Sequence, residues 1–234
     1  MIKNKGFTLA EVLITLAIIG IVAAMTIPTL ISDYQDRVNV TKMKKMFSTL
    51  TNAYGLYLTE QGPIGRLEKT EDDAIKAFEV FKPYLKVARD CGTDNGEDCV
   101  YSGSYKLRNG DDKDSEGTPW LPYTDSMYYK VILADGASIW FRGSGSDKFD
   151  IDIFYDVNGK NGPNQWGHDL FEFLVKGETV YPNGIPGTQT EKFDTGCAPS
   201  DSKGFGCAAW VIYKGNFEYL KCDDLEWNGK NKCD

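Results

Sequence analysis

Histidine is almost absent from this chain of 234 residues, in which His168 is the only one. A single histidine excludes an H-E-x-x-H zinc site, and a Ser-His-Asp arrangement would have to depend on this one residue. The sequence also lacks a nucleophile elbow, a P-loop and a dinucleotide-binding fingerprint. We therefore expect that the protein is not an enzyme and that His168 is a turn residue beside Asp169. Paired carboxylates are common in so acidic a chain, so they give no positive sign of glycosidase chemistry.

Charge is missing from residues 7–31 with one exception, Glu11. At about 1.5 Å per residue, a helix of this length spans the roughly 30 Å hydrocarbon core of a bilayer. A carboxylate at a membrane centre costs about 2.5–3.5 kcal/mol, so Glu11 needs a compensating partner. A cut in front of Phe7 would create an amine one helical turn from Glu11, in the same chain or in a neighbour. The alternative is that Glu11 lies near a helix end and reaches the headgroups.

The sequence has no small-residue cleavage box after the apolar run, so we expect the run to remain in the mature chain. Lys3 and Lys5 favour an N-terminus in the cytoplasm, whereas four basic residues between Arg37 and Lys45 argue for the opposite orientation. The cysteines decide between the two orientations.

The six cysteines contain no C-x-x-C pair, which disfavours a zinc site. Their even number fits disulfides in an oxidising compartment, so we place the domain that carries them outside the cytoplasmic membrane. Six cysteines allow fifteen sets of pairs, and the spacing favours sequential local ones. These are Cys91–Cys99, Cys197–Cys207 and Cys222–Cys233.

The stretch from Gly6 to Pro28 resembles the N-terminus of type IV pilins and type II secretion pseudopilins. The resemblance implies a leader of residues 1–6, cleavage after Gly6 by a prepilin peptidase, and methylation of Phe7 by the same processing system. It also makes Glu11 the acidic residue that acts in assembly, and Gly20 and Pro28 the helix-interrupting pair. In assembled filaments of this family the segment between such a pair can unwind; a simple proline kink is the alternative.

Beyond the apolar run, the helix is predicted to continue as an amphipathic segment and to end at Gly62-Pro63. Thr70 is expected to cap a second helix that has Ala74, Ile75, Phe78, Phe81 and Leu85 inward, and Pro83 is expected to kink or divide this helix. Strand patterns follow: a hairpin from 128 to 142 around Asp135-Gly136, a strand at 151–155 with Asp152 on its polar face, and a possible partner at 169–175. Residues 182–206 indicate a long loop, and 208–213 an apolar element of undetermined type.

The stretch from Asp156 to Asp169 is the best candidate for a ligand site. Its oxygen-bearing side chains include Asp156, Asn158, Asn161, Asn164 and Asp169, and glycines at 159 and 162 allow the chain to curl around a hard cation. Major pseudopilins place calcium in a loop of the globular domain, although this loop lacks EF-hand spacing. The simpler interpretation is two successive turns without a metal, since Asn-Gly is a strong turn signal. The predicted structural role does not require a cofactor, and calcium is the only cofactor that the sequence suggests.

Together these patterns predict an α+β, pilin-like fold: a long N-terminal helix packed on an antiparallel sheet with disulfide-pinned loops. The expected divisions are a leader (1–6), a membrane or filament-core helix (7–31), the amphipathic half of the helix (32–62) and a globular domain (63–234). The net charge of −8 disfavours nucleic acid as a partner of that domain.

The predicted function is that of a structural subunit, a pilin or pseudopilin. It would start in a bacterial cytoplasmic membrane, in contact with lipid, and then enter an extracytoplasmic filament. Its expected partners are copies of itself, other pilin-like subunits, the prepilin peptidase and methyltransferase, and an assembly platform with its ATPase. Two alternatives remain: a membrane-anchored adhesin or binding protein that never polymerises, and a membrane-anchored hydrolase whose activity would depend on specific carboxylates. The sequence does not separate a major pilin from a minor pilin or a pseudopilin.

Overall fold

The computed structural model describes residues 8–113 and 117–234. It divides into two compact units, with the boundary between Val38 and Asn39. Helix α1 (Leu9–Gln61) runs through both units. It ends at the predicted position, where Gly62 takes a φ of +75° and its N–H donates to the carbonyl of Leu58.

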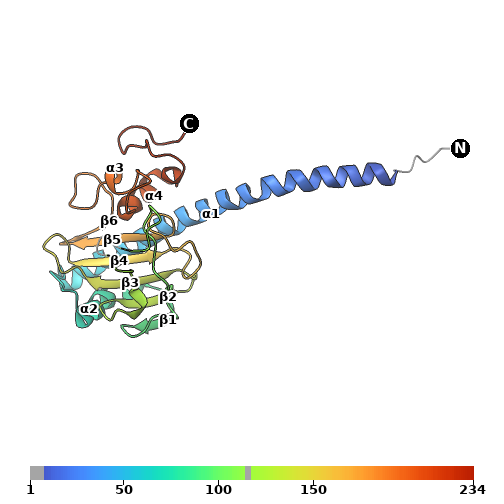
Figure 1. The fold of residues 1–234 in the computed structure, drawn as a ribbon. Helices are drawn as coiled ribbons and strands as arrows, with labels where there is room; N and C mark the ends of the chain where they lie inside the picture. Colours follow the sequence, from blue (N-terminus) through green and yellow to red (C-terminus); the bar gives the residue numbers. More distant parts are fainter. Residues whose placement is uncertain (1–7, 114–116) are drawn as a thin grey trace. The chain divides into compact units, whose positions relative to one another are not determined.

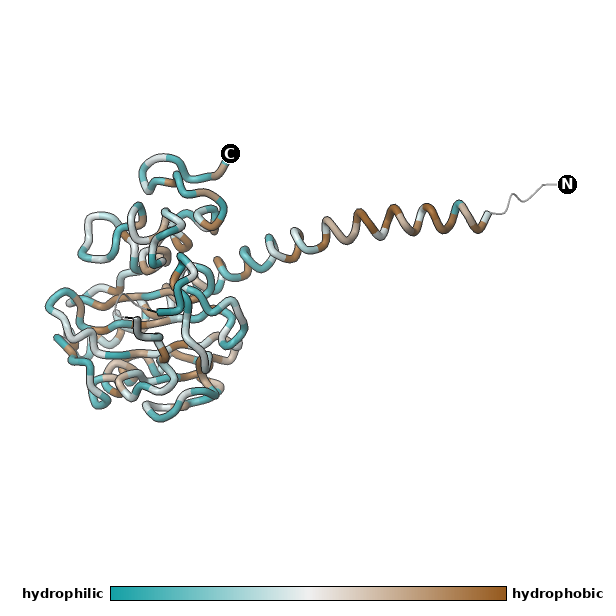
Figure 2. The backbone as a smooth tube through the Cα atoms, in the orientation of Figure 1, coloured by the Kyte–Doolittle hydropathy of each residue, from teal (hydrophilic) through white to brown (hydrophobic). Residues whose placement is uncertain are grey.

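The first unit consists of the N-terminal part of α1, whose side chains are exposed almost throughout. In Figure 2 the hydrophobic colour prevails over most of the N-terminal turns of this segment. The helix stays regular through Pro28, so the expected loosening does not interrupt it. Thr15 and Thr26 donate their hydroxyl protons to carbonyls of the preceding turn, which satisfies these groups within the helix.

In the second unit, the rest of α1 and helix α2 (Glu71–Phe81) cover one face of a sheet. Thr70 caps α2 as predicted, accepting a hydrogen bond from the N–H of Asp73 at 3.2 Å. The prediction for Ile75 is wrong: this side chain is 37% exposed. The residues of α1 that are buried lie at helical spacing, as the amphipathic pattern requires. They are Val40, Met43, Met46, Leu50, Ala53 and Tyr54.

The sheet is an antiparallel meander of six strands in chain order (Figure 1). Its strands are β1 (Val87–Gly92), β2 (Tyr129–Leu133), β3 (Ser138–Gly143), β4 (Ile151–Asp156), β5 (Leu170–Lys176) and β6 (Thr179–Pro182). The predicted hairpin is formed by β2 and β3, and Gly136 supplies the positive φ of its turn. The predicted pairing of the next two strands is also present, between β4 and β5.

The second face of the sheet is buried as well, which the strand pattern did not predict. All six residues of β4 are buried, including Asp152. The expectation of a polar outer face for Asp152 is therefore wrong: its carboxylate pairs with Arg142 under a layer of loops. Aromatic side chains from the sheet and from these loops form a second hydrophobic cluster. Its largest members are Tyr105, Tyr128, Trp140, Phe154 and Trp166.

The C-terminal region contains two helices, α3 (Phe193–Gly196) and α4 (Ala208–Lys214). The short α3 lies within the segment predicted as a long loop, and α4 settles the type of the apolar element that follows. Short 3-10 helices cover Lys82–Tyr84, Pro122–Thr124, Phe205–Cys207 and Glu218–Leu220. The structure pairs the cysteines as the spacing favoured, Cys91–Cys99, Cys197–Cys207 and Cys222–Cys233.

Candidate functional site: the N-terminal helix and the 156–169 loop

The first turn of α1 has a capping box formed by Thr8 and Glu11. A carboxylate oxygen of Glu11 accepts hydrogen bonds from the Thr8 N–H at 2.8 Å and the Thr8 hydroxyl at 2.7 Å. In return, the Glu11 N–H donates to the Thr8 hydroxyl at 3.3 Å. This reciprocal arrangement satisfies donors that the first helical turn leaves without partners. Glu11 therefore has a structural role within its own chain.

The predicted processing residues, Gly6 and Phe7, lie outside the described residues. The pairing of Glu11 with a new amine at Phe7 therefore stays a prediction. The capping bonds leave room for such a pair, because both hydrogen bonds from Thr8 go to one carboxylate oxygen of Glu11 and leave its other oxygen available.

The apolar part of α1 is long and apolar enough to cross a membrane, judged by length and composition. Its large hydrophobic side chains are exposed, among them Leu9 at 79% and Met25 at 72%. A Cβ atom placed on Gly20 would have no neighbour within 4 Å, so no contact in the described chain requires glycine there. Gly20 and Pro28 both lie inside an intact helix in this structure. Their role as a helix-interrupting pair during assembly therefore stays a prediction.

The loop between β4 and β5 brings Asp156 and Asp169 together in the protein interior. Both carboxylates are buried and both accept hydrogen bonds from the protein. Asp156 accepts from the Asn158 N–H at 3.2 Å and from the Tyr105 hydroxyl at 3.0 Å. Asp169 accepts from the N–H groups of Asn164 and Gln165 at 2.8 and 2.7 Å. These bonds shape the turns that the sequence predicts.

Burial dominates the electrostatics of the two acids in this loop. Burial raises the pKa of Asp156, and the nearby negative charge of Asp169 raises it further. Burial also raises the pKa of Asp169, while the N–H donors of Gln165 and Asn164 oppose the shift. A cation between these groups would reverse both effects.

Two buried amide oxygens in the loop, Asn158 Oδ1 and Asn164 Oδ1, have no hydrogen-bond partner among the described residues. Such orphaned oxygens are ligands that calcium accepts, together with carboxylates. Asn161 differs from the other predicted ligands: its side chain is exposed and its amide donates to the Asn158 carbonyl. Within the described ranges, no group of three or more acidic, histidine or cysteine side chains is placed to hold a metal. The loop thus fits calcium only through a mixed set of carboxylates and amide oxygens.

Tyr105 is a participant in this loop that the sequence did not predict, whereas Asn164 is one that it did. Tyr105 lies 51 residues from Asp156, and no local pattern links the two. Asn164 takes a left-handed conformation with a φ of 53°, which asparagine tolerates better than most residues, so its place in the G-P-N turn was a usable signal. His168 lies in the turn, with its N–H donating to the Gln165 carbonyl at 3.1 Å.

The loop closed by Cys91–Cys99 is also held by a buried lysine. The side chain of Lys130 is fully buried, and its Nζ donates to the carbonyls of Thr93 and Asp94 at 3.0 and 2.9 Å. Burial lowers the pKa of Lys130 to about 8, against the opposing effect of nearby carboxylates. Backbone carbonyls serve here as the partners of a buried cation, which explains a charge that the strand pattern would place at the surface.

The fold is α+β and pilin-like, a long apolar N-terminal helix followed by an antiparallel sheet with disulfides. Residues 1–27 match the family model described as the prokaryotic N-terminal methylation motif, which is characteristic of type IV pilins and pseudopilins. This match supports a type IV pilin-like or pseudopilin-like precursor, a structural class. Comparison with curated proteins gave no match, and neither did comparison with solved structures.

Proposed function

We propose that the chain is a subunit that is cleaved after Gly6, methylated at Phe7 and polymerised through α1 into a type IV pilus-like filament or a secretion pseudopilus. The methylation motif over residues 1–27 is the observation that carries this proposal. The exposed apolar surface of α1 supports it, because continuous apolar surfaces of this size occur where a membrane or another protein covers them.

Assembly moves these helices from lipid into a helical bundle, where apolar surface alone gives little driving force. We therefore assign the specificity of assembly to packing and to the pair formed by Glu11 and the processed amine of Phe7. The energy that extracts subunits from the membrane would come from a motor ATPase, and a prepilin peptidase would process the precursor.

Two substitutions at Glu11 separate capping from pairing. Glu11→Gln keeps an acceptor for the capping box but removes the negative charge, whereas Glu11→Ala removes both. We expect filaments recovered by sedimentation to be lost in both variants, and membrane levels of the subunit to remain similar. Normal assembly of the Glu11→Gln variant would show that the charge is not needed.

Mass spectrometry of the chain taken from the membrane and from the sedimented fraction tests the processing step. The expected mass is that of a chain beginning at methylated Phe7. A membrane protein that retains Met1 and never sediments as filaments would instead support a non-polymerising adhesin.

We also propose that calcium holds the 156–169 loop, with Asp156, Asn158, Asn164 and Asp169 as its ligands. The two orphaned amide oxygens and the two buried carboxylates support this assignment. When bound, calcium would neutralise the buried acids and fix the turns between β4 and β5.

Removal of calcium tests that assignment by thermal unfolding in detergent. At about a hundred times its Kd, a ligand stabilises by about 2.7 kcal/mol, which is a rise in Tm of about 5–10 °C for a domain of this size. EDTA should abolish the rise, Asp169→Asn should reduce it, and Asp201→Asn, at an exposed position, should leave it intact. An unchanged Tm with calcium and with EDTA would rule out the site.

A further inference from the structure

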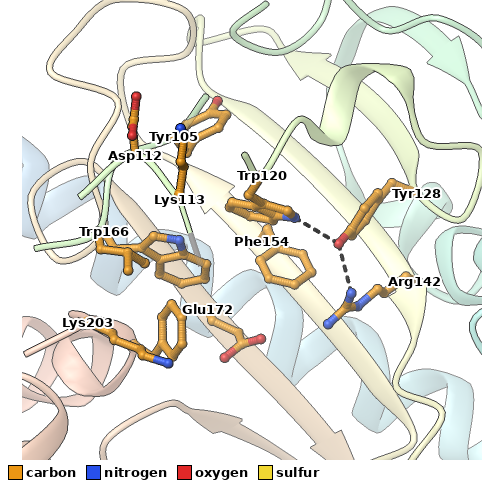
Figure 3. Close-up of a pocket in the computed structure, with 12 residues that line it drawn as sticks. Tyr105, Asp112, Lys113, Trp120, Tyr128, Arg142, Phe154, Trp166, Glu172 and Lys203 are labelled. Atoms are coloured by element: carbon orange, nitrogen blue, oxygen red, sulfur yellow. Dashed lines mark hydrogen bonds between the residues drawn. The ribbon is translucent and has the colours of Figure 1, made fainter. Parts of the chain in front are cut away.

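A cavity of about 240 Å³ lies over the face of the sheet that the helices do not cover. Its floor is formed by three neighbouring strands, with Arg142 on β3, Phe154 on β4 and Glu172 on β5 (Figure 3). Phe154 and Glu172 are direct partners in the β4–β5 register, so the sheet itself fixes their spacing. The volume is just below the range of about 300–1,000 Å³ typical of pockets for drug-sized ligands, which suits one small ring.

Aromatic rings from separate loops form the walls of this cavity. Trp120 lies 5.3 Å from Trp166 and 5.3 Å from Phe154, between ring centroids. Trp166 in turn contacts Phe205 edge to face at 4.6 Å. Trp120 and Phe205 remain partly exposed, so the cavity presents aromatic surface to a ligand. Rings held on several sides in this way are rigid, which lowers the entropy lost on binding.

The charged groups of the cavity partly balance one another. Arg142 is bound to Asp152, with nitrogen–oxygen distances of 2.8 and 2.9 Å, and donates to the Tyr128 hydroxyl at 2.8 Å. Glu172 accepts a hydrogen bond from the Asn183 amide at 2.6 Å. At the rim, the exposed side chain of Asp112 accompanies those of Lys113 and Lys203.

This balance argues against a charged ligand. An anion would find Arg142 already neutralised by Asp152. A cation would lie between the lysines of the rim and a carboxyl group, Glu172. Burial and the neighbouring Asp152 carboxylate raise the pKa of Glu172 to about 8, so it is largely neutral at pH 7. The donors and acceptors instead suit a ligand that carries hydroxyl groups and an apolar face.

We propose that this cavity binds a neutral pyranose ring of a carbohydrate. The C–H face of the sugar stacks on Trp120 and Phe205, and its hydroxyl groups exchange hydrogen bonds with Glu172 and Lys203. This activity is separate from polymerisation through α1. It gives the globular unit a ligand of its own, such as a free sugar or a ring of a longer glycan.

The experiment uses the full chain in a detergent that has no sugar headgroup. Tryptophan fluorescence and saturation-transfer NMR are recorded during titration with methyl glucopyranoside, galactose, mannose and N-acetylglucosamine, and with the corresponding disaccharides to separate single rings from longer glycans. Choline and acetate serve as the cationic and anionic probes.

Phe205→Ala removes one stacking surface, and we expect the affinity for the responding sugar to fall about five- to tenfold. Lys203→Ala, at an exposed position that the fold does not need, should weaken binding about threefold. Tyr213→Ala is the matched control: this aromatic side chain is 51% exposed and does not line the cavity, so binding should be unchanged.

Saturable binding of at least one sugar, weakened in the two cavity variants and not in the control, supports the proposal. It is overturned if no sugar gives a saturable response, or if choline or acetate binds in the cavity and the sugars do not. Equal weakening in the Tyr213→Ala variant would also overturn it, because the sugar would then bind elsewhere.

Discussion

Glu172 makes the stability of the globular unit depend on pH, and its replacement by glutamine should remove that dependence. Burial, and to a lesser extent the carboxylate of Asp152, raise the pKa of Glu172 from 4.5 to about 8, against the opposing effects of Arg142 and Asn183. The folded protein thus holds a proton on Glu172 at pH values where the unfolded chain has released it. Between about pH 4.5 and 8, the free energy of unfolding should therefore fall as pH rises.

The magnitude follows from the difference between the two pKa values. At about 1.4 kcal/mol per unit, ionising Glu172 in the folded state costs on the order of 3–5 kcal/mol. Below pH 4.5 this cost is absent, because Glu172 is protonated in both states. Above pH 8 it is complete. Glu172→Gln keeps the shape of the side chain and stays neutral, so the variant should match the native protein near pH 5 and exceed it by a few kcal/mol near pH 8.5.

The assay is urea unfolding in mild detergent at pH 5, 7 and 8.5, followed by tryptophan fluorescence. Glu178→Gln makes the same chemical change at an exposed position in the turn after β5 and should leave the pH dependence intact. Subtracting the curves removes the contributions of all other titrating groups. If the Glu172→Gln variant and the native protein lose stability in parallel from pH 5 to 8.5, the buried-acid interpretation is wrong.

Two further predictions concern packing. A Cβ atom on Gly143 would lie 2.0 Å from the Glu68 carbonyl oxygen, so Gly143→Ala should lower the free energy of unfolding by about 1–3 kcal/mol. The same change at Gly55, a helical position with no neighbour within 4 Å, should instead raise it by about 0.5–1 kcal/mol, and effects of equal sign would contradict the packing argument. The Tyr54 hydroxyl donates to the Gly177 carbonyl at 2.5 Å, so Tyr54→Phe should cost about 1 kcal/mol in urea unfolding, and no measurable loss would show that this bond adds nothing to stability.

Local signals were sufficient for much of this fold. The end of α1, the Thr70 cap and the Asp135-Gly136 hairpin each depend on residues a few positions apart, and the structure confirms all three. The sequential cysteine pairs belong to the same class, because short loops make neighbouring cysteines the natural partners.

The features that the sequence did not predict depend mainly on the loops that cover the second face of the sheet. Asp152 reads as an outward residue in an alternating strand, yet loops far away in the chain bury it with Arg142. The prediction for Ile75 fails in the opposite direction: it is expected to be buried, but this apolar residue lies at the edge of the buried face of its helix and is exposed. The hydrogen bond from the Tyr105 hydroxyl to Asp156 likewise depends on tertiary structure, and no spacing within the sequence predicts it.

The two units therefore differ in how their apolar side chains are covered. The globular unit buries aromatic residues on both faces of one sheet, with a small cavity on the second face. The described part of the first unit leaves its apolar side chains exposed, with Glu11 and Thr8 satisfying the polar groups of the first turn. Because the apolar side chains of the first unit are not covered by the described part of their own chain, they require an environment that covers them. In our proposal, lipid meets that requirement before processing and neighbouring helices meet it afterwards.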